Sequence, residues 1–272
     1  MERAVIDDIA LEYEDPGPGE PVLCIHGAFV ADSFRPLLSQ RELTERYRLI
    51  TYHRRGYAGS SRTTDRVSLA EQAEDCRRLL SHLRIPRAHV LGHSSGGAIG
   101  LQLALDAPNQ VQTLSLLEPA LIVGESADQY RHGLLHNLER YRQVGARVAV
   151  DEFLRMRWPE YPEQLERMAP GAFEQAVGDA ATFFDVDLPA FIDWRFGEQE
   201  ARRITQPALA VLGEKSVALH PRFAETHRVL LSWLPAAEGF VLPKASHFLQ
   251  FENPRSLARA LTDFYTRHPL GG

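Results

Sequence analysis

One serine of the chain lies between two glycines at a spacing that suits a catalytic nucleophile. Gly92, Ser94 and Gly96 form a Gly-x-Ser-x-Gly pattern, which follows an apolar run ending at Leu91 and precedes a stretch of small and apolar residues. A strand, a sharp turn and a helix in this order push the serine hydroxyl out of the sheet edge. The crowded turn requires residues without a side chain on both sides. The pattern therefore predicts Ser94 as a nucleophile.

A nucleophilic serine that attacks a carbonyl needs hydrogen-bond donors for the developing oxyanion. The N–H of Ser95, at the amino end of the predicted helix, is one candidate donor. A second apolar run ends at Ile25 and continues into a His-Gly pair, and the residue after the glycine, Ala28, is the other candidate. We expect Phe29, which follows, to line the substrate pocket.

The hydroxyl of serine is a weak nucleophile at neutral pH and needs a neighbouring imidazole to accept its proton. Of the eleven histidines, only His247 lies between the last predicted strand and the last predicted helix. In chain order the base comes last in folds with this kind of elbow. The position predicts His247 as the general base.

The segments around these residues alternate between strand and helix patterns. A hairpin is predicted over 1–15, and continuous apolar runs or helical periodicity define the remaining elements. The predicted strands are 21–25, 48–52, 89–91, 111–117, 207–212 and 239–242, and the predicted helices are 33–47, 68–83, 95–105, 222–233 and 255–266. This alternation favours an α/β fold with a mostly parallel sheet.

The region 122–203 breaks the alternation. It has helical periodicity, several prolines and no clear strand, so we expect a helical cap inserted into a core formed by 1–121 and 204–272. Its aromatic and methionine residues suggest an apolar pocket. They are Tyr130, Phe153, Met156, Trp158, Tyr161, Phe183, Phe184, Phe191 and Trp194.

Four segments together resemble the α/β-hydrolase superfamily, and more narrowly its small esterases, lactonases, non-haem haloperoxidases and carbon–carbon bond hydrolases. They are the His-Gly pair at 26–27, the loop 52–61, the Gly-x-Ser-x-Gly elbow and the stretch 246–254. The resemblance implies the α/β-hydrolase fold, with helices flanking the central sheet and a cap after the strand at 111–117.

One position departs from the family pattern. Members commonly carry a catalytic Asp in a Gly-x-x-Asp stretch after the strand that follows the cap, where this chain has Gly213 and Ser216. Serine cannot stabilise an imidazolium as a carboxylate does. Glu118, at the end of the strand 111–117, is the favoured substitute, because some haloalkane dehalogenases and zearalenone-hydrolase-like lactonases place the acid there. Glu214 is the second candidate.

The resemblance implies a serine hydrolase that cleaves a carboxylic ester or a lactone through an acyl-enzyme. A first alternative is a carbon–carbon bond hydrolase acting on a diketone with the same residues, in which Arg54 or Arg55 could bind a carboxylate. A second alternative is a hydrolase-fold receptor or accessory protein with little turnover.

Composition restricts the partners. The chain has 272 residues with 30 basic and 36 acidic side chains, a net charge of −6, so we expect no nucleic-acid partner. No apolar run is long enough to span a bilayer, the two cysteines lie in apolar contexts, and no cofactor or metal motif is present. We expect a cytoplasmic enzyme with a small-molecule substrate, and the sequence leaves its oligomeric state open.

Overall fold

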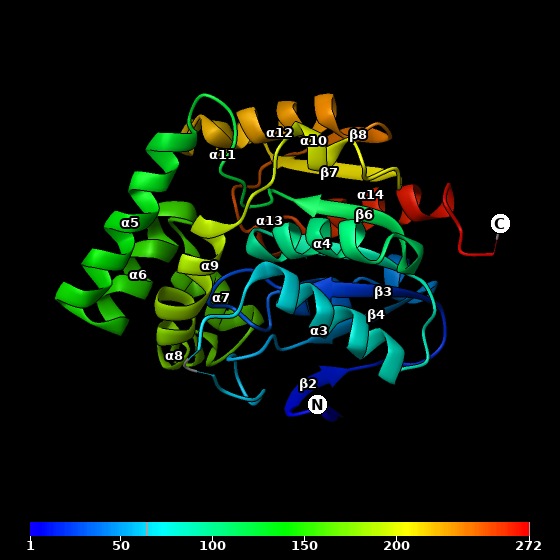
Figure 1. The fold of residues 1–272 in the computed structure, drawn as a ribbon, viewed down its shortest axis with the longest axis horizontal. Coiled ribbons are helices and arrows are strands. Elements are labelled where there is room, and N and C mark those ends of the chain that lie inside the picture. Colours follow the sequence, from blue (N-terminus) through cyan, green and yellow to red (C-terminus); the bar gives the residue numbers. More distant parts are fainter. Residues whose placement is uncertain (64, 272) are drawn as a thin grey trace.

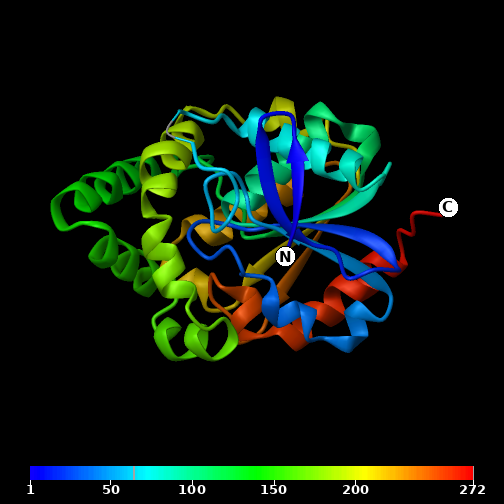
Figure 2. The same cartoon turned by 90° about the horizontal axis from the view of Figure 1, so that it is seen from below.

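The computed structural model describes residues 1–63 and 65–271. A central sheet is covered by helices, and a separate group of helices lies beyond one end of the sheet (Figure 1). Figure 2 shows the same group on the same side of the molecule, opposite the C-terminus. The sheet therefore has one edge that the helical group covers.

The central sheet has the strand order β1-β2-β4-β3-β5-β6-β7-β8. The strands are β1 Glu2–Ile6, β2 Ile9–Glu14, β3 Glu20–Ile25, β4 Tyr47–Tyr52, β5 Ala88–His93, β6 Val111–Leu117, β7 Ala208–Gly213 and β8 Ala237–Leu242. The pairs β1–β2 and β2–β4 are antiparallel, and all other neighbouring pairs are parallel. This is the mostly parallel sheet that the alternation of elements predicts.

Helices cover both faces of the sheet because the strands are apolar on both sides. In β3, Leu23 and Ile25 belong to one buried cluster, and Val22 and Cys24 belong to the other. The first cluster includes residues of α3 Leu69–His82, α4 Ser95–Asp106 and α12 Arg222–Trp233. The second includes residues of α1 Arg35–Leu38, α2 Arg41–Thr44, α13 Leu249–Glu252 and α14 Pro254–Thr266.

The predicted helix over 33–47 is divided in the structure. Two short helices, α1 and α2, are separated at Gln40, whose backbone is extended with φ −93° and ψ 97°. By contrast, α3 begins as its sequence predicts, with a capping box between Ser68 and Glu71. Local capping was readable from the sequence, whereas the break at Gln40 carries no glycine or proline signal.

Between β6 and β7 the chain forms only helices among the described residues. We call this stretch the inserted helices; it runs from Ala127 to Ala201 and packs at the sheet edge where β6 ends (Figures 1 and 2). It comprises α5 Ala127–Val144, α6 Ala146–Arg157, α7 Tyr161–Met168, α8 Ala172–Gly178, the π-helical turn η2 Thr182–Asp187, α9 Leu188–Asp193 and α10 Glu198–Ala201. The short helices η1 Pro108–Gln110 and α11 Ser216–Leu219 lie outside it.

Candidate active site

The strand order creates a crevice at the carboxyl edge of the sheet. After β3 the chain continues to helices on one face, and after β5 it continues to a helix on the other face. Loops that leave neighbouring parallel strands in opposite directions open a crevice between them, where ligands of such sheets bind. The loops that begin at His26 and Ser94 border this crevice.

Ser94 has the strained backbone expected of an elbow, with φ 53° and ψ −119°. A non-glycine residue in such a conformation costs about 1–3 kcal/mol and needs support from its surroundings. Its N–H donates to the carbonyl of Leu117 at 3.0 Å, and its carbonyl accepts from the N–H of Ala120 at 2.9 Å. A Cβ on Gly96 would lie 2.0 Å from the carbonyl oxygen of Ile25, so only glycine fits there.

The loop after β3 lies directly against the elbow. A Cβ on Gly27 would be 3.1 Å from the Cβ of Ser94, and Ala28 lines the same cavity as Ser94 and Ser95. Within residues 1–63 and 65–271, the backbone N–H groups of Ala28 and Ser95 donate to no protein acceptor. Two unengaged donors beside a strained serine are what an oxyanion hole needs.

His247 lies in the loop between β8 and α13, and Glu118 lies directly after β6. Their side chains form a buried pair. The Nδ1 of His247 lies 2.8 Å from Oε2 of Glu118, and Oε1 of Glu118 accepts from the N–H of Gly213 at 2.7 Å. Since the carboxylate accepts from Nδ1, the lone pair is left on Nε2, the atom that a general base uses. In the described part of the chain no hydrogen bond joins Ser94 Oγ to this ring; such bonds often tighten only when substrate binds.

The other candidate acid, Glu214, points elsewhere. Its Oε2 accepts from the backbone N–H of Lys244 at 2.8 Å. Ser216 is fully buried. Of the two carboxylates suggested by the sequence, only Glu118 contacts His247.

Burial and charge determine the protonation of this pair. Burial raises the pKa of Glu118 to about 7, although the hydroxyl of Ser216, the amide of Gly213 and the charge of Arg222 all act to lower it. Burial, and then the charges of Arg222 and Arg157, hold the pKa of His247 well below its usual value. The imidazole is therefore neutral at neutral pH and able to accept a proton.

His93, inside the elbow, contacts the backbone of His247. Its Nε2 donates to the carbonyl of His247 at 2.8 Å, and Gln250 contacts its Nδ1 at 3.3 Å. Burial, reinforced by the neighbouring His247, lowers the pKa of His93 to about 3, so this ring stays neutral. His93 thus ties the loop that carries the base to the strand that carries the nucleophile.

A cavity lies over Ser94. Its core side includes Ala28, Ser95 and Ile99, and the inserted helices supply most of the apolar wall. The residues of that wall are Tyr130, Leu134, Phe153, Phe183, Leu188 and Phe191. A mostly apolar lining of this kind suits a small organic substrate.

The aromatic residues predicted for the pocket divide into two groups. Tyr130, Phe153, Phe183 and Phe191 line the cavity, whereas Trp158 is buried outside it. The remaining ones, Met156, Tyr161, Phe184 and Trp194, do not line it either.

Phe29 also lies behind the wall, in contrast to the expectation that it lines the pocket. It is fully buried, and its ring centroid is 4.9 Å from that of Phe153 and 4.5 Å from that of Phe183. Its backbone has a positive φ of +66°.

Comparison with known proteins agrees with this architecture. The model of a family described as the alpha/beta hydrolase fold matches residues 20–254. The chain belongs to this family.

Two curated relatives and one solved structure illustrate the range of the family. The chain is 29% identical over 254 residues to the dihydrolipoyllysine-residue acetyltransferase component of the acetoin cleaving system of Pseudomonas putida, covering 92% of this chain but only 64% of that protein. It is 25% identical to a 2-hydroxymuconate semialdehyde hydrolase of Pseudomonas putida, covering 92% and 88% of the two chains. The structure of the enol-lactonase from Burkholderia xenovorans LB400 superposes with a TM-score of 0.83 at 20% identity, covering 97% and 100%.

Two arginines of this α/β hydrolase that the sequence offered as carboxylate binders are already paired. The guanidinium of Arg54 donates to Asp187 at 2.9 Å, and that of Arg55 lies 2.6 Å from Asp75. Tyr57 also donates to Asp187, at 2.7 Å. Arg55 is thus paired with Asp75, whereas Arg54 also lines the cavity and its Nε has no hydrogen-bond partner among the described residues.

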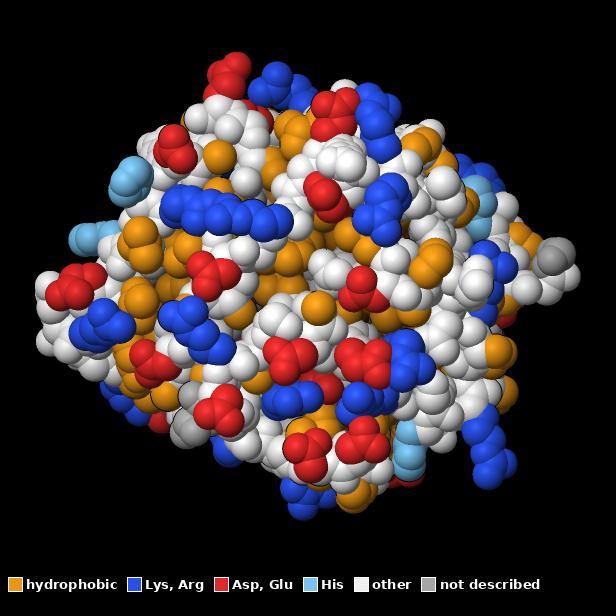
Figure 3. Space-filling view, in the orientation of Figure 1, with side chains coloured by type: hydrophobic (Ala, Val, Ile, Leu, Met, Phe, Trp, Pro, Cys, Tyr) orange, Lys and Arg blue, Asp and Glu red, His pale blue; other side chains and the backbone are white. Residues whose placement is uncertain are grey.

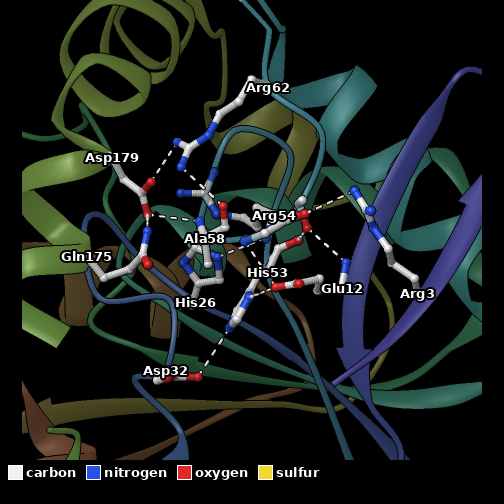
Figure 4. Close-up of polar contacts among 12 residues, drawn as sticks. Arg3, Glu12, His26, Asp32, His53, Arg54, Ala58, Arg62, Gln175 and Asp179 are labelled. Carbon is white, nitrogen blue, oxygen red and sulfur yellow. Dashed lines mark hydrogen bonds and ion pairs between the residues drawn. The ribbon is translucent and has the colours of Figure 1, made fainter. Parts of the chain in front are cut away.

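The loop after β4 connects the hydrolase core to the inserted helices, as Figure 4 shows. The N–H of Ala58 donates to Asp179 at 3.0 Å, and Arg62 and Gln175 also contact this carboxylate. The N–H of Arg54 donates to Nε2 of His26 at 2.9 Å. The loop after β3, the loop after β4 and α8 are therefore held together by polar contacts.

Three charged residues of the cavity were not singled out by sequence reasoning: Arg157, Asp187 and Arg222. Each lies on a helical segment where charged residues are ordinary, so no local pattern marks it.

In Figure 3, acidic and basic side chains are interspersed over the visible face, in line with the many surface ion pairs.

Residues 1–63 and 65–271 form neither a metal site nor a membrane span. No group of three or more His, Cys, Asp or Glu side chains is arranged to hold a metal ion. No helix there combines the length and apolar character needed to cross a bilayer.

Proposed function

We propose that this α/β hydrolase cleaves a carboxylic ester or lactone through an acyl-enzyme, with Ser94, His247 and Glu118 as its triad. The observation that carries the proposal is the 2.8 Å contact between His247 Nδ1 and Glu118 beside a serine in the strained elbow conformation. In chain order the three residues follow the nucleophile, acid, base sequence of this fold.

In the first step Ser94 Oγ attacks the ester carbonyl while Nε2 of His247 accepts its proton. Glu118 holds the imidazole in the tautomer that this transfer requires and stabilises the imidazolium. The N–H groups of Ala28 and Ser95 stabilise the oxyanion. His247 then protonates the leaving alcohol, which departs and leaves the acyl group on Ser94.

In the second step water hydrolyses the acyl-enzyme. His247 removes a proton from water, the hydroxide attacks the acyl carbonyl in the same oxyanion hole, and Ser94 leaves with the proton from His247. The inserted helices act as a cap that shields the intermediate, and the apolar wall of the cavity favours an apolar or aromatic group on the substrate.

A carbon–carbon bond hydrolase is the second candidate. The observation that favours it is the similarity, over most of both chains, to the 2-hydroxymuconate semialdehyde hydrolase. The same three residues would serve. We place ester or lactone cleavage first because the free amides and the neutral imidazole meet its full requirement.

The test is hydrolysis of p-nitrophenyl butyrate by wild type, Ser94→Ala and Glu118→Gln, with Glu214→Gln as the matched control. We expect Ser94→Ala to lose activity, Glu118→Gln to lose roughly 10²- to 10⁴-fold in kcat, and Glu214→Gln to stay within a few-fold of wild type. Equal losses in the two glutamate variants would remove Glu118 from the triad. Absence of wild-type turnover would favour the diketone hydrolase or a receptor-like protein.

A further inference from the structure

Two arginines that line the cavity above Ser94 carry no acidic partner. Arg157, the last residue of α6, is 8% exposed, and Arg222, the first residue of α12, is 5% exposed. Across the described ranges neither guanidinium takes part in an ion pair, although Arg54 in the same cavity is paired with Asp187. An uncompensated buried charge is costly, so its retention calls for an explanation.

The hydrogen bonds of the two guanidiniums are equally incomplete. Nη1 of Arg157 donates to the carbonyl of Phe153 at 3.1 Å and approaches the sulfur of Met156 at 3.9 Å. Nη1 of Arg222 is buried without a partner. A guanidinium has five donors, so most of this capacity is unused.

Aromatic rings rather than carboxylates surround these charges. The guanidinium carbon of Arg157 lies 3.5 Å from the ring centroid of Phe153. That of Arg222 lies 4.1 Å from Tyr130 and 3.9 Å from Phe223. Stacking orients a guanidinium and leaves its edge donors free, and this arrangement suits recognition of a planar anion.

Arg157 and Arg222 also lie where two neighbouring spaces of the molecule meet. They line both the cavity above Ser94 and a neighbouring groove of about 630 Å³ between α5 and the segment 219–223. Tyr130 and Leu134 are shared by the two spaces as well. A substrate that reaches Ser94 from this groove passes both guanidiniums.

We propose that Arg157 and Arg222 together bind a carboxylate of the substrate, so that the preferred ester or lactone carries a second, free carboxylate group. The reacting group in this statement rests on the proposed function, whereas the anion site rests on the two arginines alone. A carboxylate matches the donor fork of arginine and supplies the charge that the site lacks.

Binding of the anion would also affect the base. The charges of Arg222 and Arg157 contribute to the lowered pKa of His247. A carboxylate between them offsets this field, which makes it easier for His247 to accept the proton of Ser94 but also raises the pKa of Glu118, which the charge of Arg222 lowers. Because these two effects oppose each other, the expected advantage of anionic substrates lies in binding.

The first test compares two esters of equal chain length, mono-p-nitrophenyl adipate and p-nitrophenyl hexanoate. Wild type should favour the adipate at least about ten-fold in kcat/KM, which is the size of one hydrogen bond to a charged group. Arg157→Met, Arg222→Met and the double variant should lose this preference, which is measured within each variant as the ratio of its kcat/KM values for adipate and hexanoate. Arg155→Met, an exposed arginine on the same helix paired with Asp151, should retain it.

The second test does not depend on turnover. Calorimetry should detect binding of mono-p-nitrophenyl adipate to Ser94→Ala. The affinity should fall at least about ten-fold in the Ser94→Ala protein that also carries Arg222→Met, and it should persist in the one that also carries Arg155→Met. Equal binding with and without the two cavity arginines, or an unaltered preference in the double variant, would overturn the inference and leave the esterase proposal intact. Arginine-dependent binding without any ester turnover would support the anion site and reject the esterase proposal.

Thermal unfolding separates a binding role from a structural one. Arg222→Met removes an unpaired buried charge, so Tm should hold or rise by about 2–5 °C. Arg54→Met leaves the buried carboxylate of Asp187 without its ion-pair partner and should lower Tm. A fall in Tm for Arg222→Met equal to that for Arg54→Met would assign Arg222 to structure and count against the proposal.

Discussion

Among single residues, Glu118 departs most from the family pattern. It ends β6 with a positive φ of 42°, and one carboxylate oxygen contacts His247 while the other accepts from the N–H of Gly213. Burial makes its ionisation unfavourable, in contrast to an acid in a solvated loop. The protonation of this acid, rather than that of the imidazole, should therefore limit activity near neutral pH.

The pH dependence of kcat/KM follows from these shifts. His247 is neutral over the whole range because its pKa is lowered, and Glu118 ionises only as pH rises through a pKa of about 7. We expect kcat/KM for a neutral ester to increase roughly ten-fold per pH unit below that value and to level off above it. The measured value belongs to the coupled pair.

In Glu118→Gln the increase of kcat/KM with pH should disappear because glutamine does not ionise. The pH profile of kcat/KM should then be flat and low. A wild-type profile that is flat from about pH 5.5 to about pH 8.5 would contradict the assignment of Glu118 as the limiting group.

At the scale of elements, loops from distant parts of the chain meet around His53. Its Nδ1 lies 3.0 Å from Glu12 of β2, and its Nε2 lies 3.2 Å from Asp32, which is in the segment between β3 and α1 (Figure 4). Burial alone would lower the pKa of His53, but its hydrogen bonds to Asp32 and Glu12 outweigh burial and raise it. The charged form of His53 thus joins β2, the β4 loop and the segment before α1.

This contact predicts a pH-dependent stability. A raised pKa in the folded state means that the stabilisation is complete below about pH 6.5, the unfolded value, and is lost as pH rises through the higher folded value. The free energy of unfolding of wild type relative to His53→Gln should therefore be about 1 kcal/mol greater at about pH 6 than at about pH 8.5. Urea unfolding at the two pH values measures it.

Glu118 also titrates in this range, but it is present in both proteins and cancels in the difference. A difference that does not change with pH, or that increases towards alkaline pH, would show that the imidazolium form of His53 is not the stabilising one.

At the scale of the whole molecule, one buried ion pair joins the core to the inserted helices. Asp187 ends the π-helical turn η2 and accepts from Arg54 and Tyr57 of the β4 loop. Ser246, next to the base, also donates to the carbonyl of Arg157, at 3.1 Å. The inserted helices thus set both the cavity wall and part of the loop that holds His247.

Removing the charge of Asp187 should be costly, because it leaves Arg54 buried and unpaired. We expect Asp187→Asn to lower the free energy of unfolding by about 3 kcal/mol and Asp185→Asn, an exposed position in the same turn, to change it by less than about 0.5 kcal/mol. Chemical denaturation of the two variants compares them directly. Equal small effects would mean that the pair contributes little to holding the inserted helices in place.

The sequence by itself determined the strands and most helices of the core, although not the division of 33–47 into α1 and α2, and it identified the nucleophile and base candidates. The elbow is readable because the strain at Ser94 and the close approach at Gly96 impose residue types within five positions. The strands are readable because burial on both faces demands continuous apolar runs, and α3 is readable from its cap. These are local requirements of the backbone.

Only the tertiary structure decided which charges meet. Glu118 and Glu214 were both open as partners of His247, and the register of β6 beside β5 and β7 brings Glu118 to it. Arg54 was a candidate for substrate binding, and the fold pairs its guanidinium with Asp187, 133 positions away. Arg157 and Arg222 carry no local signal, since an arginine becomes chemically unusual only when folding removes water without supplying an anion.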